Sequence, residues 1–156
     1  MRFAVLGSGS GGNSTIVECD GEYLLVDAGL SAKQLNLRLE QLGVAPEKLS
    51  GILLTHEHGD HVRGLDVFLR KCPVPILASI MTGRVVQEGL REPVEWIVFE
   101  SGQKFSWKGF DFMTFPLPHD AVEPVGYVIT RGKYSVGVVT DLGHVDNQVT
   151  LALKGV

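Results

Sequence analysis

The chain is organised around Thr55-His56-Glu57-His58-Gly59-Asp60-His61, which places three imidazoles and a carboxylate in one short turn. The apolar run Ile52–Leu54 before it predicts a buried strand, and Val62–Leu69 after it predicts a helix with one apolar face. Imidazole nitrogens and carboxylate oxygens suit zinc, manganese or iron, and no thiolate is present to favour a structural zinc site. The turn therefore predicts a catalytic metal site between a strand and a helix.

The spacing within this turn indicates two metal ions. His56 and His58 are two residues apart, so in an extended chain they point to the same side and can hold one ion. Asp60 and His61 follow off that line and can reach a second ion. One open site takes fewer ligands than these from a single loop. The alternatives are a structural metal site and a polar loop that merely carries several histidines.

Two polar residues farther along the chain also follow predicted strands, as the histidine turn does. His119 follows Phe115–Pro118 at a predicted strand end, and Asp141 follows Val138–Thr140 at another. Ligands in open α/β sheets gather at the carboxyl ends of strands, so we expect both residues at the rim that holds the first cluster. A dinuclear centre needs a further neutral ligand and a bridging carboxylate, which selects His119 and Asp141. His144 has no comparable claim and is predicted to be a loop residue.

The glycines of Gly7–Gly12 match the dinucleotide-binding pattern G-x-G-x-x-G, directly after the predicted strand Arg2–Leu6. That pattern needs a following helix to receive the pyrophosphate. Here Asn13–Cys19 is rich in β-branched residues and leads into Asp20-Gly21, a hairpin turn. The glycines are therefore predicted to let the backbone approach the metal cleft, with a plain tight turn as the alternative.

A helix is predicted after the third strand. Asp27 ends that strand and is either an acceptor that orients a histidine ligand or a turn residue. Ser31 is the expected N-cap, and Gly43 the expected stop. The stripe of Leu35, Leu39 and Leu42 is expected in the core.

The rest of the chain completes a mixed α/β pattern. Strands and helices alternate as far as Trp96–Phe99, and short strands with turns follow from Gln103 onwards. This order predicts a mixed sheet layered with helices, not a strictly parallel one. Asp146 is the expected N-cap of a closing helix.

Composition fits one domain. The chain has 156 residues, of which 44% are hydrophobic, and a net charge of −4. It contains no apolar run of the ~20 residues that span a bilayer and no secretory signal, so we expect a cytoplasmic protein without a membrane partner. Cys19 and Cys72 are expected to be free thiols. The acidic balance offers no broad basic surface for nucleic acid.

Together these features resemble the metallo-β-lactamase fold. Within that superfamily, Gly7–Ser14, His119–Ala121 and Pro124–Tyr127 resemble the bacterial YycJ branch, also called WalJ or VicX. The resemblance implies an αββα sandwich and two divalent ions, expected to be zinc, with manganese or iron as alternatives. The residues that it assigns are His56, His58 and His119 to the first ion, Asp60 and His61 to the second, and Asp141 as the bridge.

The resemblance also implies a function. It predicts a metal-dependent hydrolase of the phosphodiesterase or nuclease kind, acting on nucleic acid or another phosphodiester through a hydroxide activated by two metals. Asp60 is the expected catalytic residue, orienting the hydroxide or taking its proton. The alternatives are a hydrolase of a thioester, lactone or lactam, and a catalytically incompetent metal-binding fragment.

One departure from the family concerns the C-terminal side. Family members continue past residue 156 into a second half that supplies a last histidine, and His144 is too near Asp141 to replace it. Residues 1–156 are therefore expected to be a metallo-β-lactamase-like domain truncated at its C-terminus, with an underfilled second metal site. The apolar surface left bare is expected to favour a homo-oligomer.

Overall fold

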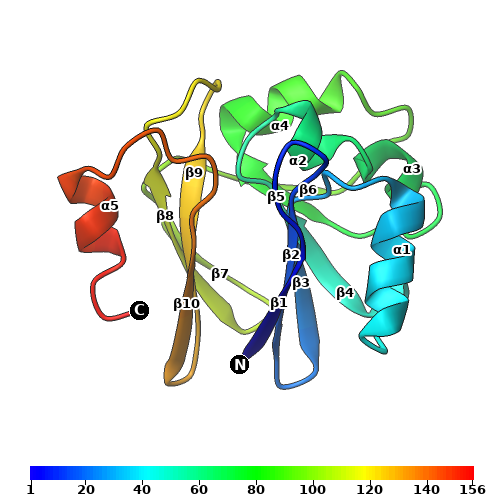
Figure 1. Ribbon diagram of the computed structural model, residues 1–156, viewed down its shortest axis with the longest axis horizontal. Helices are drawn as coiled ribbons and strands as arrows, with labels where there is room; N and C mark the ends of the chain where they lie inside the picture. Colours follow the sequence, from blue (N-terminus) through cyan, green and yellow to red (C-terminus); the bar gives the residue numbers. More distant parts are fainter.

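In the computed structural model, which describes residues 1–156, two β-sheets face each other and helices cover their outer sides (Figure 1). The strands of the larger sheet are β1 (Arg2–Gly7), β2 (Ser14–Cys19), β3 (Glu22–Val26), β4 (Leu49–Leu53), β5 (Ile76–Ser79) and β6 (Trp96–Phe99). Those of the smaller sheet are β7 (Lys104–Trp107), β8 (Phe110–Pro116), β9 (Val125–Arg131) and β10 (Tyr134–Val138). The helices are α1 (Ala32–Gln41), α2 (Gly59–Val62), α3 (Leu65–Leu69), α4 (Ile80–Gln87) and α5 (Asn147–Ala152), with a 3-10 turn over Pro46–Lys48.

The larger sheet is mixed, as predicted. Its strands lie in sequence order, antiparallel from β1 to β3 and parallel from β3 to β6, whereas the smaller sheet, ordered β10-β9-β8-β7, is wholly antiparallel. Asp20 and Gly21 have φ angles of 54° and 80° and turn β2 into β3, which confirms the hairpin. The glycine run after β1 therefore leads into a strand, and the dinucleotide interpretation fails for want of a helix.

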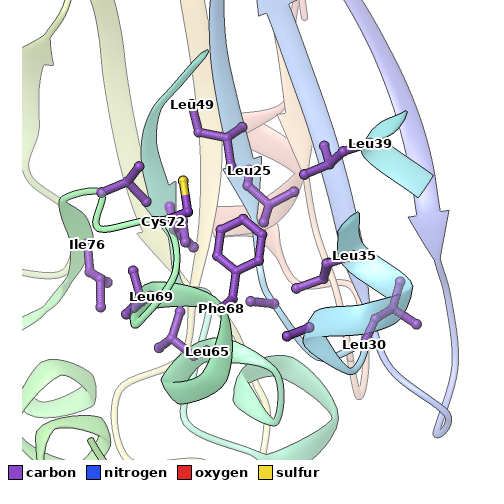
Figure 2. Packing of buried hydrophobic residues seen from close by; sticks show 14 of the residues in the cluster. Leu25, Leu30, Leu35, Leu39, Leu49, Leu65, Phe68, Leu69, Cys72 and Ile76 are labelled. Carbon is purple, nitrogen blue, oxygen red and sulfur yellow. The ribbon is translucent and has the colours of Figure 1, made fainter. Parts of the chain in front are cut away.

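The central strands β3, β4 and β5 of the larger sheet are buried on both faces, with side chains alternating between the two faces. On β3, Leu24 and Val26 face the smaller sheet, while Leu25 faces the helices. Figure 2 shows the helix side, where the Phe68 ring of α3 lies among Leu25 of the sheet and Leu35 of α1. Burial on both faces explains why these strands are apolar runs without polar alternation.

The layers form the αββα sandwich that the resemblance implies. Helices α1, α3 and α4 cover the outer face of the larger sheet, and α5 lies against the smaller one (Figure 1). Val149 of α5 is 1% exposed and packs with Phe115 and Val128. The predicted fold class is confirmed.

The prediction that Leu42 belongs to the core is wrong. Leu35 and Leu39 are fully buried, but Leu42 is 49% exposed. Helix α1 ends at Gln41, and Leu42 is its C-cap residue, so it no longer follows the helical spacing that would bring it onto the buried face. Ser31 caps the other end, accepting a hydrogen bond from Gln34 N–H at 3.3 Å, as expected.

The helix predicted over Val62–Leu69 is divided into α2 and α3. The break falls at Gly64, whose N–H donates to Ala28 O at 2.8 Å. A Cβ at this position would lie 2.0 Å from Leu30 O, so only glycine allows the two backbones to approach this closely. The break therefore follows from packing across the chain and not from helix propensity.

Cys19 and Cys72 are both buried and free, as expected. None of the helices combines the length and apolarity needed to cross a membrane.

Candidate metal centre

Strands from both sheets end at the same edge of the sandwich, and the predicted site residues follow them. His56 comes after β4, His119 after β8 and Asp141 after β10. Strands β8 and β10 both run antiparallel to β9, so their carboxyl ends lie on the same side. The two sheets are joined here because Val125 N–H at the start of β9 donates to Thr55 O at 3.0 Å.

Three histidines form a first group. One ring nitrogen each from His56, His58 and His119 lies within 4.8 Å of the others. The closest pair is His58 Nδ1 and His119 Nε2, at 3.2 Å. Three nitrogens this close to one another can bind one ion together, and His119 comes from the smaller sheet.

A second group consists of His56, His61 and Asp141, whose ligand atoms also lie within 4.8 Å of one another. Asp141 Oδ2 is 2.5 Å from His61 Nε2 and 3.7 Å from His56 Nε2. His56 thus belongs to both groups, and Asp141 faces the space between the two rings.

Asp60 lies beside the two groups and not within them. Its Oδ2 is 3.7 Å from His61 Nε2 and accepts a hydrogen bond from Asn13 Nδ2 at 3.1 Å. The carboxylate is 30% exposed, so it faces the open side of the site. It could therefore meet a substrate or a solvent proton.

Buried hydrogen bonds fix which nitrogen of each imidazole is free. The Asp27 carboxylate accepts from Thr55 N–H at 2.8 Å, from the Thr55 hydroxyl at 2.8 Å and from His61 Nδ1–H at 2.8 Å. Because the Thr55 hydroxyl donates its only proton to Asp27, it must accept from His56 Nδ1–H, 3.0 Å away. Both Nε2 atoms are left with a lone pair that points into the site. Asp27 is therefore the orienting acceptor, the first of the two predicted roles.

The electrostatics agree with a ligand role for His56. Burial lowers the pKa of His56 to about 3, and the neighbouring histidine charges act in the same direction. For His61, burial also lowers the pKa, but the hydrogen bond to Asp27 and the charges of Asp27, Asp141 and Asp60 outweigh it and raise the pKa above its ordinary value. Burial raises the pKa of Asp27 above its ordinary value, although the hydrogen bonds from His61 and Thr55 act to lower it.

His56 Nε2 provides the test of whether a metal fits. It is buried and has no hydrogen-bond partner, although such nitrogens are usually satisfied. Ligand atoms of His58, His119, His61 and Asp141 each lie within 4.8 Å of a ring nitrogen of His56. An unpartnered lone pair among such donors is what a divalent cation requires.

Two strand-end aspartates have unusual backbone conformations. Asp27 and Asp141 have φ angles of 60° and 50°, in the left-handed region that non-glycine residues seldom adopt. Such conformations cost free energy and cluster at functional sites. In both places the chain turns sharply out of its strand, which directs the carboxylate toward His61.

Three residues without a predicted role support the site. The Thr55 hydroxyl links His56 to Asp27, and Asn13 contacts Asp60. Glu57 Oε1 accepts from Val122 N–H at 2.9 Å, which ties the loop containing His119 to the histidine turn. Their role depends on long-range contacts, which sequence spacing does not reveal.

Two further residues, His144 and Asp146, lie where expected. His144 is an exposed loop residue outside both ligand groups. Asp146 caps α5 by accepting from Val149 N–H at 2.8 Å.

Known proteins resemble this chain over most of its length. Residues 22–156 match the model of the "Beta-lactamase superfamily domain". Exodeoxyribonuclease YycJ of Bacillus anthracis is 34% identical across 99% of this chain and 60% of its own length. Exodeoxyribonuclease WalJ of Streptococcus pneumoniae is 34% identical across 96% of this chain and 57% of its own. The expected likeness to the YycJ branch is confirmed, and the chain spans about 60% of the length of these curated relatives.

Solved structures share the fold. Zn²⁺-bound PqqB from Methylobacterium extorquens superposes with a TM-score of 0.80 at 17% identity, covering 97% of this chain and 69% of that one. The short form of human tRNase Z superposes with a TM-score of 0.74 at 20% identity, covering 98% and 73%. At these identities the likeness concerns the fold alone.

Proposed function

The chain belongs to the beta-lactamase superfamily, and on that basis we propose that it is a metal-dependent hydrolase that cleaves phosphodiester bonds of nucleic acid. The observation that carries the proposal is the buried, unpartnered Nε2 of His56, shared by two groups of ligand atoms. The kinship with proteins named exodeoxyribonuclease favours DNA as the substrate.

Two divalent ions are proposed, with zinc as the metal and manganese or iron as alternatives, because all donors are nitrogen or oxygen. Asp141 would bridge the ions, since its Oδ2 faces both His56 and His61. Asp60 would serve the second ion from the side. The proposed ligands are His56, His58 and His119 for the first ion and His61, Asp60 and Asp141 for the second.

Bound divalent ions supply two things to such a reaction: they lower the pKa of water to about 7 and they neutralise the charge of a phosphodiester. The chain's own residues supply orientation. Thr55 and Asp27 hold His56 and His61 in the tautomers that present Nε2. The low pKa of His56 keeps this imidazole neutral, with its lone pair available, at neutral pH.

Asp60 is proposed as the residue that orients the attacking water and takes its proton. Its carboxylate is partly exposed at the edge of the site, whereas Asp27 is buried and saturated with hydrogen bonds. A general base must reach the proton that it removes, and only Asp60 of these two is accessible.

The test combines metal content with substrate selectivity. Protein purified without a histidine tag or chelator is analysed by plasma mass spectrometry, and then assayed on end-labelled DNA, bis(p-nitrophenyl) phosphate, a thioester and nitrocefin. The double variant His56→Ala, His58→Ala removes ligands, and His144→Ala is the matched control because this histidine is exposed and outside both groups.

We expect two ions per chain in the parent and in the His144 variant, the second held less tightly because its expected ligand set is underfilled. We expect no ion in the double variant, and cleavage of the two phosphodiesters only. Turnover of the thioester or nitrocefin without DNA cleavage would contradict the phosphodiester substrate, but the protein would still be a hydrolase. Absence of metal after incubation with zinc, manganese and iron would overturn the proposed function.

A further inference from the structure

Asn13 connects the glycine run after β1 to the metal centre. It directly follows Gly12 and is 9% exposed. Its amide reaches Asp60, which lies 47 positions away in the sequence. The Asn13 side chain is not one of the proposed metal ligands.

The orientation of the Asn13 amide is set by its hydrogen bonds. Gly9 N–H donates to Asn13 Oδ1 at 2.8 Å, which makes that atom the oxygen and turns Nδ2 the other way. Nδ2 then lies 3.1 Å from Asp60 Oδ2 and 3.0 Å from His61 Nε2. In the neutral tautomer whose Nδ1–H donates to Asp27, His61 Nε2 accepts the second N–H of the Asn13 amide until an ion takes that lone pair.

The backbone around Asn13 is held independently of its side chain. Asn13 N–H donates to Asp60 O at 2.7 Å, and Gly29 N–H donates to Asn13 O at 2.9 Å. Glycines make this approach feasible, because a Cβ at Gly12 would lie 2.6 Å from Gly29 O. Replacing the Asn13 side chain therefore removes the amide while the main-chain contacts remain.

We propose that Asn13 is a positioning residue, whose amide holds the Asp60 carboxylate beside His61 Nε2 so that Asp60 can serve the second ion and the attacking water. This inference rests on the proposed function. Without the amide, Asp60 is free to rotate toward solvent, because its side chain is 30% exposed and no other side chain donates to it. Groups that orient ligands in this way contribute about 10- to 100-fold to metal affinity.

The test is a calorimetric zinc titration of the metal-free protein, which reads ion binding and not activity. Asn13→Ala is compared with the parent and with Ser10→Ala, an exposed substitution in the same glycine-rich turn. We expect Asn13→Ala to weaken the second binding step about 10- to 100-fold and to leave the first step unchanged. Ser10→Ala should match the parent.

A double-mutant cycle with Asp60→Ala tests whether Asn13 acts through Asp60. If it does, Asn13→Ala has no further effect on the second step once the Asp60 carboxylate is gone. Additive losses, equal weakening of both steps, or an unchanged second step in Asn13→Ala would each overturn the inference.

The outcomes also separate this inference from the proposed function. A parent protein that binds two ions but cleaves no phosphodiester would contradict the function and leave the positioning role intact. A parent protein with a single binding step would overturn the positioning role, because no second ion is bound, and would leave hydrolysis with one ion to be decided by the cleavage assay.

Discussion

Asp27 Oδ2 lies 2.8 Å from Nδ1 of His61, and both side chains are almost completely buried. The pair connects β3 to the turn after β4 and fixes the imidazole before any ligand arrives. A ligand histidine held by a buried carboxylate keeps one tautomer and one ring orientation. Folding therefore already orients much of this site before an ion binds.

Asp27→Asn tests this arrangement. An amide nitrogen in place of Oδ2 would face His61 Nδ1–H and disfavour the tautomer that presents Nε2. We expect the affinity for the second zinc ion to fall about 10- to 100-fold by calorimetric titration. Asp20→Asn is the control, because Asp20 has a similar φ of 54° but is 74% exposed. Equal affinities in both variants would contradict the orienting role.

Thr55→Val replaces the hydroxyl by a methyl group of similar size. His56 Nδ1–H then loses its acceptor and Asp27 loses a donor, both in the interior. Buried groups left unpaired cost about 1–3 kcal/mol, and we expect the free energy of unfolding in urea with chelator to fall by that amount. Thr15→Val, in β2, provides the comparison and should change it little. A stable Thr55→Val protein with unchanged zinc affinity would argue against the hydrogen-bond chain.

Gly29→Ala should disrupt the contact between the loops after β3 and β4. A Cβ there would lie 1.6 Å from Asp60 O, which is backbone and cannot yield locally. We expect a loss of more than about 3 kcal/mol in unfolding free energy, together with loss of the second ion. Gly59→Ala is matched, since a Cβ at Gly59 meets open space in the same histidine turn. Similar stability of the two variants would contradict the close packing.

Glu57→Ala should act on the first ion instead of the second. The carboxylate of Glu57 accepts from Val122 N–H and so restrains the loop that presents His119. We expect the first zinc affinity to fall about tenfold, with the second step affected less. The exposed Glu92→Ala controls for the loss of a charge. A selective effect on the second ion would show that the loop is held by other contacts.

The stability of the metal-free protein should depend on pH through the protonation of His56. Its pKa is about 3 in the folded chain and about 6.5 when unfolded, so the unfolded state binds more protons between these values. Stability therefore falls as the pH drops through this window, by up to about 2 kcal/mol between pH 7 and pH 5. The pKa of His61 is raised in the folded protein, so His61 affects stability above pH 6.5. There, the stability that His61 contributes is lost as the pH rises through its pKa in the folded protein.

His56→Gln should remove this slope, because the substituted side chain does not titrate. His144→Gln, which replaces an exposed histidine, should keep it. Urea unfolding with chelator at several pH values measures both. An identical slope in the two variants would show that His56 titrates normally in the folded protein.

The sequence by itself determined the strands, the histidine turn and the strand-end positions of His119 and Asp141. These depend on local rules: side chains alternate along a strand, Asp20-Gly21 favours a hairpin, and ligands gather where strands end. The same rules placed Leu42 in the core and ran one helix across Gly64. The first error arose because α1 ends before Leu42, and the second because packing between distant segments breaks the helix at Gly64.

Only the tertiary structure decided how the site is held. Asn13 meets Asp60 because Gly12 and Gly29 allow separate loops to touch backbone to backbone. Thr55 bridges Asp27 to His56 because β3 and β4 are paired and end side by side. Which nitrogen of an imidazole is free depends on what the other nitrogen bonds to. That partner comes from elsewhere in the chain, so residue types and spacing identified the candidate ligands but not the network that orients them.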